Sequence, residues 1–199
     1  EELGGVESHA HYSGVVHFVA ADDADAVAIA RRLLDFLPAN NTEDPPFIAE
    51  LHEAALYPDD GFSAIVPADP REPYDMREVV QRTLDRGDFL EVQAAYAANL
   101  VIGFGRVAGR TVGVLANQPM VRAGALDIDA SDKAARFIRF CNAFNIPLLT
   151  FVDVPGFLPG VRQELGGIIR HGAKMLFAYA AATVPKVTIV VRKAYGGAY

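Results

Sequence analysis

The sequence predicts an α/β fold in which helices flank a mixed, largely parallel sheet. Residues 147–152 and 186–191 are apolar runs of strand length, and the second run shows no strict alternation of polar residues. Such runs are typical of parallel strands buried on both faces. Residues 131–145 and 163–182 have helical periodicity and alternate with these strands. Strand–helix–strand order calls for crossover helices and parallel pairing.

The first part of the chain contains one predicted strand and one predicted helix. The short apolar run at 15–20 predicts the strand. Asp22 or Asp23 is expected to cap a helix that reaches about Phe36, and Pro38 ends it because proline cannot continue a helix. The face expected to be buried comprises Val27, Ala30, Leu34 and Leu37.

A loop and a linker are predicted next. Residues 40–46 read Asn-Asn-Thr-Glu-Asp-Pro-Pro, a strong loop signal and a candidate domain boundary. The following stretch to Pro73 is acidic and proline-rich, with a short strand expected at 63–66. A helix is expected over 75–85. Its inward positions are Met76, Val79, Val80 and Leu84.

Two further strands, 100–107 and 111–117, are predicted to form a hairpin around Ala108 and Gly109. The glycines of residues 103–109 superficially resemble a dinucleotide-binding fingerprint. Their spacing is wrong, and a strand follows where the fingerprint requires a helix. We therefore reject nucleotide binding here. Ser131 is expected to cap the next helix, whose inward face comprises Ala134, Phe137, Ile138, Cys141 and Phe144.

The composition argues against a membrane-spanning protein and against a nucleic-acid-binding protein. The 199 residues are 51% hydrophobic and 22% charged, which is enough for a packed core. The apolar runs are strand-sized, so no membrane span is expected. A net charge of −7 disfavours nucleic-acid binding. Residues 161–199 are nevertheless basic, which suits either an anionic ligand such as a CoA phosphate or ordinary charges at helix and strand ends.

The glycine pair after the last strand is the main candidate site. Gly196 and Gly197 follow the apolar run 186–191. Glycine permits a tight turn and lets backbone amides approach a ligand closely. Amides at such a position can stabilise a developing oxyanion without an ionisable side chain. Judged on the glycine pair alone, we favour the other interpretation, a plain turn that ends a strand.

Five other residues are weighed between a chemical and a structural role. Asp153 ends a strand and is either an acid/base residue or, as we favour, the cap of a local turn. His171 is either a general base or, as we favour, a packed or surface histidine. His9 and His11 lack a third ligand at suitable spacing, so we expect no metal. Cys141 is expected to be a small buried hydrophobe.

Three blocks in the second half of the chain resemble one enzyme family. They are residues 153–160 (DVPGFLPG), 167–174 (GIIRHGAK) and 192–199 (RKAYGGAY). In this order they resemble the carboxyltransferase (β) subunits of biotin-dependent acyl-CoA carboxylases, the propionyl-CoA carboxylase group. The match extends back through residues 37–41 and 2–5. The resemblance implies a crotonase-like fold, a β-β-α superhelix, and a chain that is an internal segment of a longer subunit.

The resemblance also implies a domain organisation. Residues 1–41 are expected to end an N-terminal acyl-CoA domain, and residues 42–74 to form the linker and crossover. Residues 75–199 are expected to form the first part of a C-terminal biotin domain. The glycine pair that stabilises the acyl-CoA enolate would lie upstream of Glu1, and the family site lies between two subunits.

The implied reaction is carboxyl transfer from carboxybiotin to the α carbon of a short acyl-CoA, most plausibly propionyl-CoA, with acetyl-CoA or longer chains as alternatives. The biotin is carried covalently by a partner, the biotin carboxylase or carrier subunit. Carboxybiotin releases CO2 as its N–C bond breaks, the freed biotin nitrogen takes the α proton of the acyl-CoA, and the resulting enolate captures the CO2. No metal is implied. A homo-oligomer, a hexamer in the family, is expected.

By resemblance, the amides of Gly197 and Ala198 form the oxyanion hole on the biotin side. The residues implied to line the same site are Gly196, Gly156, Phe157 and Gly160. Rival readings are a biotin-dependent decarboxylase or transcarboxylase subunit, a crotonase-type CoA hydrolase or isomerase, and a non-catalytic scaffold subunit. The implied compartment is the cytoplasm in a bacterium or the mitochondrial matrix in a eukaryote.

Overall fold

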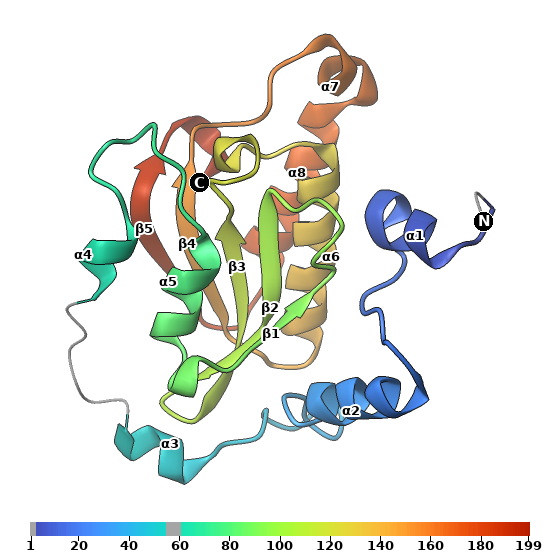
Figure 1. Cartoon of the computed structure of the whole chain (residues 1–199), viewed down its shortest axis with the longest axis vertical. Coiled ribbons are helices and arrows are strands. Elements are labelled where there is room, and N and C mark those ends of the chain that lie inside the picture. Colours follow the sequence, from blue (N-terminus) through green and yellow to red (C-terminus); the bar gives the residue numbers. More distant parts are fainter. Residues whose placement is uncertain (1–2, 55–60) are drawn as a thin grey trace.

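The computed structural model describes residues 3–54 and 61–199 and has an α/β fold, as predicted (Figure 1). The strands are β1 (Phe89–Val92), β2 (Leu100–Val107), β3 (Arg110–Asn117), β4 (Leu148–Val154) and β5 (Lys186–Ala194). The α-helices are α1 (Val6–Ser8), α2 (Asp23–Leu34), α3 (Ala49–Ala54), α4 (Phe62–Ile65), α5 (Met76–Thr83), α6 (Ile128–Ala143), α7 (Val161–Gly166) and α8 (Ile168–Ala181). Residues 1–2 of the predicted acyl-CoA domain and 55–60 of the predicted linker lie outside the described residues.

The five strands form one mixed sheet in the order β1-β2-β3-β4-β5. β1, β2 and β3 pair antiparallel, whereas β3–β4 and β4–β5 pair parallel. The predicted β2–β3 hairpin is confirmed, and its turn residues Ala108 and Gly109 both have positive φ. The carboxylate of Asp85 accepts hydrogen bonds from both of their amides, at 3.0 and 2.7 Å. β1 was not predicted, because a run of four residues is too short to be recognised as a strand from the sequence alone. It becomes a strand by pairing with β2.

Helices cover both faces of the sheet (Figure 1). α6 and α8 lie on one face, where aromatic side chains such as Phe104 and Phe137 pack with centroids 5.2 Å apart. α5 lies on the other face, where its buried Met76, Val79 and Val80 match the predicted inward positions. Among the described residues, every helix is too short or too polar to cross a bilayer.

Two helix boundaries differ from the prediction. α6 begins one turn earlier than expected, because Asp127 rather than Ser131 is its cap and accepts a hydrogen bond from the Ala130 amide at 2.9 Å. Ser131 lies inside the helix and donates to the Asp127 carbonyl at 2.7 Å. The single helix expected over 163–182 is two helices, α7 and α8. They are separated at Gly167, whose φ of 85° interrupts the helical backbone.

The prediction was least accurate before β1. Residues 15–20 form no strand in the structure. Among the described residues no strand pairs with this segment, and its backbone hydrogen bond to the sheet region runs from the Gln93 amide to the His17 carbonyl. The strand expected at 63–66 is instead the short helix α4. α2 is confirmed with Asp22 as its cap, but its expected buried face is not buried, since Val27 and Leu34 are 51% and 67% exposed.

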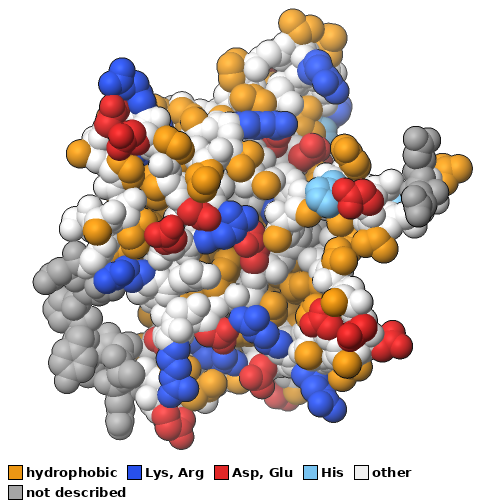
Figure 2. Space-filling model, in the orientation of Figure 1, with side chains coloured by type: hydrophobic (Ala, Val, Ile, Leu, Met, Phe, Trp, Pro, Cys, Tyr) orange, Lys and Arg blue, Asp and Glu red, His pale blue; other side chains and the backbone are white. Residues whose placement is uncertain are grey.

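β5 was expected to be buried on both faces, and this expectation was wrong. It is one of the two edge strands of the sheet, and Val187 and Val190 are more than half exposed because the described residues pack little against them. The ends of α7 and α8 also expose large apolar side chains, among them Val161, Leu165 and Ile169. Figure 2 shows hydrophobic side chains gathered at the top of the molecule, where Figure 1 places α7.

Candidate active site

The loop after β4 is held by a neighbouring segment that enters α6. Leu126 and Phe157 form an isolated parallel bridge. The Leu126 amide donates to the Gly156 carbonyl at 3.1 Å, and the Leu158 amide donates to the Leu126 carbonyl at 2.7 Å. Gly156 and Gly160 have φ values of 144° and 140°, which side chains disfavour. These two glycines therefore let the loop leave the strand and turn into α7.

Phe157 and Gly197 line the same groove. Its volume is about 500 Å³, and its other walls include Ile168, Ile169 and Gly172 of α8. The two glycine-containing loops thus meet at the carboxyl ends of the parallel strands β4 and β5, where ligands of parallel α/β sheets bind. The predicted residues Gly156, Gly160 and Gly196 flank the loops but do not themselves line this groove.

The turn after β5 is a single turn of 3-10 helix, Gly196–Ala198. Gly196 has a φ of 66°, so its backbone favours glycine. Gly197 has no such conformation, and a β carbon placed on it would meet no atom within 4 Å. In a 3-10 turn the first amides lack an internal acceptor, whereas the i→i+3 pattern directs the Ala198 amide toward the Tyr195 carbonyl. The Gly197 amide is therefore the better placed donor of the two.

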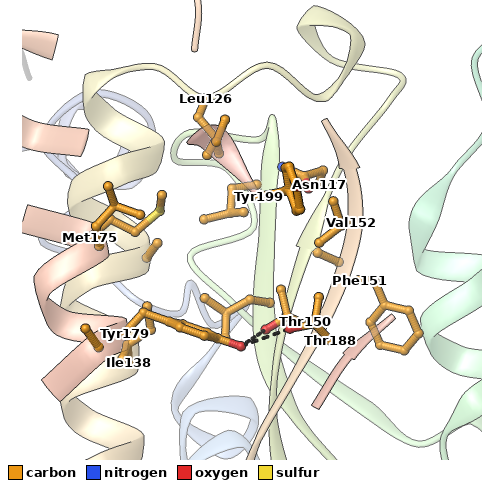
Figure 3. Close-up of a pocket in the computed structure, with 17 residues that line it drawn as sticks. Asn117, Leu126, Ile138, Thr150, Phe151, Val152, Met175, Tyr179, Thr188 and Tyr199 are labelled. Atoms are coloured by element: carbon orange, nitrogen blue, oxygen red, sulfur yellow. Dashed lines mark hydrogen bonds between the residues drawn. The ribbon is translucent and has the colours of Figure 1, made fainter. Parts of the chain in front are cut away.

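A second cavity of about 380 Å³ lies between the sheet and the α6–α8 pair, and Ala198 and Tyr199 form part of its wall (Figure 3). Its lining is almost entirely apolar. Its polar side chains include Asn117 and, at the base, a group in which the Tyr179 hydroxyl lies 3.2 Å from the hydroxyls of both Thr150 and Thr188. The glycine turn thus stands between an internal apolar cavity and the open groove that contains Phe157.

Asp153 is fully buried at the end of β4, and other side chains and amides bind both of its carboxylate oxygens. Oδ2 accepts from the Tyr74 hydroxyl and from Arg192 Nε, both at 2.9 Å, and Oδ1 accepts from the Lys193 amide at 3.1 Å. Burial, followed by the charge of Asp153, raises the pKa of Tyr74, which keeps this hydroxyl protonated as a donor. The carboxylate therefore caps the neighbouring strand rather than its own local turn.

His171 joins an ion-paired cluster between α6 and α8. Its Nδ1 lies 3.0 Å from both carboxylate oxygens of Asp132, and Lys174 Nζ donates to Asp132 at 2.6 Å. Burial alone would raise the pKa of Asp132, but the hydrogen bonds from Lys174 and His171 outweigh it, so the pKa is lowered. The favoured interpretation of His171 as a packed histidine agrees with this arrangement.

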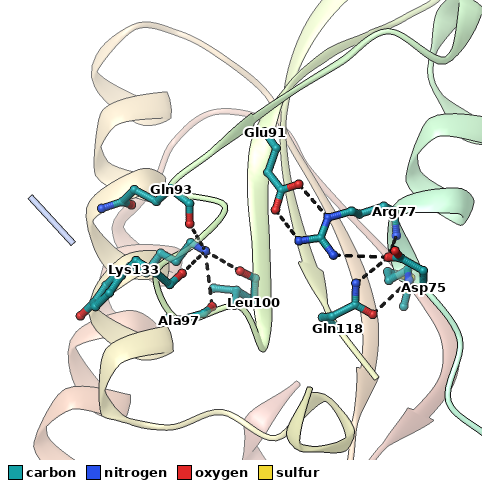
Figure 4. Close-up of polar contacts among 10 residues, drawn as sticks. Asp75, Arg77, Glu91, Gln93, Ala97, Leu100, Gln118 and Lys133 are labelled. Atoms are coloured by element: carbon teal, nitrogen blue, oxygen red, sulfur yellow. Dashed lines mark hydrogen bonds and ion pairs between the residues drawn. The ribbon is translucent and has the colours of Figure 1, made fainter. Parts of the chain in front are cut away.

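Sequence reasoning overlooked Lys133, a buried lysine on α6. Its ammonium group donates to four backbone carbonyls between β1 and β2 (Figure 4). The acceptors are Gln93 at 3.0 Å, Tyr96 at 2.7 Å, Ala97 at 3.4 Å and Leu100 at 2.7 Å. Burial lowers the pKa of Lys133 to about 7, and the negative charge of Glu91 acts in the opposite direction. A signal was present, because Lys133 lies three residues after Ala130 and four before Phe137 on the apolar face.

The remaining candidates have structural partners. His9 Nδ1 lies 2.8 Å from the Ser13 hydroxyl, and His11 Nδ1 lies 3.3 Å from a Glu7 carboxylate oxygen. Among the side chains that the structure describes, those of residues 3–51 and 61–199, no three His, Cys, Asp or Glu side chains are grouped to hold a metal. Cys141 is buried, as predicted, and burial raises the pKa of its thiol. One of the basic residues of the C-terminal region is an ordinary helix-end charge, because the Lys186 ammonium group donates to the Tyr179 and Ala182 carbonyls at the end of α8.

Comparison with known proteins identifies close relatives. The chain is 59% identical over 199 residues to the methylmalonyl-CoA carboxyltransferase 12S subunit of Propionibacterium freudenreichii subsp. shermanii. It is 57% identical over 206 residues to the propionyl-CoA carboxylase beta chain of Saccharopolyspora erythraea. Each alignment covers 100% of this chain and 38% of the relative, so the chain spans little more than a third of their length.

The fold agrees with that of a solved relative. A crystal structure of the transcarboxylase 12S hexamer, with methylmalonyl-CoA and methylmalonic acid bound, superimposes with a TM-score of 0.94 at 58% identity, covering 100% of this chain and 38% of that one. This likeness confirms the predicted crotonase-like α/β fold. The carboxyl transferase domain family matches residues 1–199. The chain therefore belongs to the carboxyl transferase domain family.

Proposed function

We propose that the protein containing this chain transfers a carboxyl group from carboxybiotin to the α carbon of a short acyl-CoA, with propionyl-CoA as the first substrate to test. Relatives at 54% to 59% identity support the reaction class, because they are named as a methylmalonyl-CoA carboxyltransferase subunit, a propionyl-CoA carboxylase beta chain and a methylmalonyl-CoA decarboxylase subunit. Biotin supplies the carboxyl group and a nitrogen that accepts the α proton. A partner carrying that biotin, and assembly as a homo-oligomer, are part of the proposal.

The observation that carries the site assignment is the open space at Gly197. The fold imposes no steric or backbone requirement for glycine there, yet this position lines the groove next to Phe157. Glycine at this position lets a ligand oxygen approach the backbone amide closely, because no side chain stands in the way. We assign the Gly197 amide as the principal donor that stabilises negative charge on the biotin ureido oxygen. Such a donor contributes about 3 kcal/mol, or roughly a hundredfold in rate. The Ala198 amide can add to this only by sharing its proton with the Tyr195 carbonyl, toward which the 3-10 turn directs it.

The other predicted residues shape this groove. Phe157 presents its ring in the wall, and Gly156 and Gly160 set the backbone of the loop that holds it. Gly196 sets the conformation of the turn itself. We also propose the domain boundaries 1–41, 42–74 and 75–199, because the whole sheet lies within the last of these ranges. The proposed compartment is the cytoplasm in a bacterium or the mitochondrial matrix in a eukaryote.

The test is Gly197→Val in the complete carboxyltransferase subunit. Because the side chain has room, the variant should fold, and acyl-CoA should bind with unchanged Kd since its oxyanion hole is expected elsewhere. Carboxyl transfer to propionyl-CoA should fall at least about a hundredfold. Ala181→Val, an equally β-branched change at the exposed end of α8, is the matched control and should keep full activity. Normal transfer by Gly197→Val would show that this turn is not the site.

The same preparation separates the rival functions. Turnover of an acyl-CoA without any biotin donor would favour a hydrolase or isomerase. Net conversion of methylmalonyl-CoA to propionyl-CoA and free CO2 by way of carboxybiotin, with no net carboxylation of propionyl-CoA by the complete assembly, would favour the decarboxylase, for which the 54% identical methylmalonyl-CoA decarboxylase subunit alpha of Veillonella parvula is the precedent. An inability of the wild-type protein to support any of these reactions would favour a scaffold subunit.

A further inference from the structure

We propose that Asp153 is a positioning residue that sets the place of the Gly196–Ala198 turn through a bulge in β5. The inference rests on the proposed function of that turn. The register shows the bulge directly, because Val152 pairs with Val190 and Val154 pairs with Ala194. β4 advances by two residues over this interval, whereas β5 advances by four. Bulges of this kind bend a strand and redirect the chain beyond it.

The side chain of Asp153 occupies the gap that the bulge opens. A regular ladder would pair the backbone of β5 with the backbone of β4, but here the Lys193 amide donates to Asp153 Oδ1 at 3.1 Å. Backbone pairing resumes immediately afterwards, since the Tyr195 amide donates to the Val154 carbonyl at 3.2 Å. The glycine turn begins at the next residue. Asp153 therefore fixes the path of the chain just before the turn.

Arg192 closes the other side of this arrangement. Its Nε donates to Asp153 Oδ2, and its NH1 donates to the carbonyls of Asp69 and Glu72, both at 3.0 Å. The guanidinium also lies over the ring of Tyr74, 4.9 Å from its centroid. The bulge is thus clamped between a fully buried carboxylate and the 69–74 segment, and the strand end has little freedom to shift.

The same contacts argue against acid/base chemistry by Asp153. Both of its oxygens are bound, and the side chain has no exposed surface. It accordingly has no direct route to a ligand in the groove. A displacement of about 1 Å in a catalytic group can cost about a hundredfold in rate. We therefore expect Asp153→Asn, which keeps the shape but gives up one acceptor oxygen, to lower kcat roughly 10- to 100-fold.

The experiment compares Asp153→Asn with Asp85→Asn in the complete subunit. Asp85 is the matched control, because its carboxylate also accepts two backbone amides, those of the β2–β3 turn. Hydrogen exchange should accelerate at residues 193–199 in Asp153→Asn and stay at the wild-type rate there in Asp85→Asn. The drop in kcat should be confined to Asp153→Asn, with unchanged acyl-CoA Kd and an unchanged pH profile.

Other outcomes overturn the proposal. A loss beyond a thousandfold together with a missing limb of the pH profile would make Asp153 an acid/base residue. Equal effects of both variants would make its role generally structural.

Tyr74→Phe is the second variant, to be used if Asp153→Asn does not fold. It removes one donor to the carboxylate and should lower kcat about 5-fold while accelerating hydrogen exchange at residues 193–199. Wild-type values of both kcat and exchange would reject the proposal. Exchange is measured without turnover, so a wild-type protein that lacks carboxyl transfer would reject the proposed function separately.

Discussion

The ring of Phe157 lies directly against the backbone of Gly172 on α8. A β carbon at Gly172 would stand 2.8 Å from Cζ of that ring, closer than real contacts allow. Phe157 is the side chain through which the loop after β4 shapes the candidate groove. The glycine of α8 and the aromatic residue of the loop therefore form one structural unit, although they belong to different sequence blocks.

Gly172→Ala should alter the groove without touching the glycine turn. The added methyl group forces the Phe157 ring to move, and overpacking of this kind costs about 1–3 kcal/mol in stability. We expect KM for the biotin donor to rise several-fold while the acyl-CoA Kd stays unchanged, as measured by steady-state kinetics and calorimetry. Phe157→Ala should raise the same KM. An unchanged KM in both variants would remove Phe157 from the biotin side.

Lys133→Met should destabilise the protein strongly. The change leaves four backbone carbonyls without their cation, and buried unsatisfied groups cost about 1–3 kcal/mol each before relaxation or water entry. We expect a loss of at least about 3 kcal/mol in the free energy of unfolding, measured by denaturant titration. Lys174→Met is the matched control. Its side chain is 40% exposed and its ammonium group forms an ion pair with Asp132, so its removal should cost less than about 1 kcal/mol.

The sequence predicted the elements whose burial follows from local pattern. α5 is correct because Met76, Val79 and Val80 repeat at helical spacing and meet the sheet. The meeting of Phe157 and Gly197 was also predictable, since both follow parallel strands. The partners of Asp153 were not. Tyr74 lies 79 positions away, and a bulge in β5, invisible as a pattern, brings Lys193 to the carboxylate.

The errors have an equally physical cause. Apolar periodicity predicts that a face will be covered but does not say by which segment. Val27 in α2 and Val187 in β5 follow buried-type patterns, yet the described residues leave both more than half exposed. The helix break at Gly167 was a misjudgement of a visible signal, because a glycine pair inside a helical pattern is a candidate termination.

The Asp132 cluster should make stability depend on acid pH. The pKa of Asp132 is lowered on folding, so its stabilising effect is present above the unfolded value of about 4 and is lost as pH falls through the folded pKa. Asp132→Asn should therefore be less stable than wild type at pH 6–7, by about 1 kcal/mol or less, and the difference should shrink toward pH 3. Denaturant midpoints measured across this range give the comparison. A difference that stays constant with pH would exclude an ionic contribution.

Arg106 should hold the end of α2 to the sheet. Its side chain is nearly buried, its NH2 donates to the Asp35 carbonyl at 2.7 Å, and its guanidinium lies 4.4 Å from the centroid of the Phe36 ring. Phe36 is itself fully buried among the side chains of the sheet and α6. We expect Arg106→Met to lower the free energy of unfolding by about 2 kcal/mol through the lost cation–π contact and hydrogen bond. Proteolysis between α2 and α3 should accelerate.

Arg110→Met is the control for that experiment, because Arg110 also lies over a phenylalanine, 5.0 Å from the centroid of the Phe47 ring, but is exposed. Its loss should cost about 0.5–1 kcal/mol and leave cleavage between α2 and α3 at the wild-type rate. Arg106→Lys should behave nearly as badly as Arg106→Met, because an ammonium cannot stack on Phe36 and reach the Asp35 carbonyl in the planar geometry of the guanidinium. If Arg106→Lys restores wild-type stability and protease resistance, positive charge alone holds α2 in place.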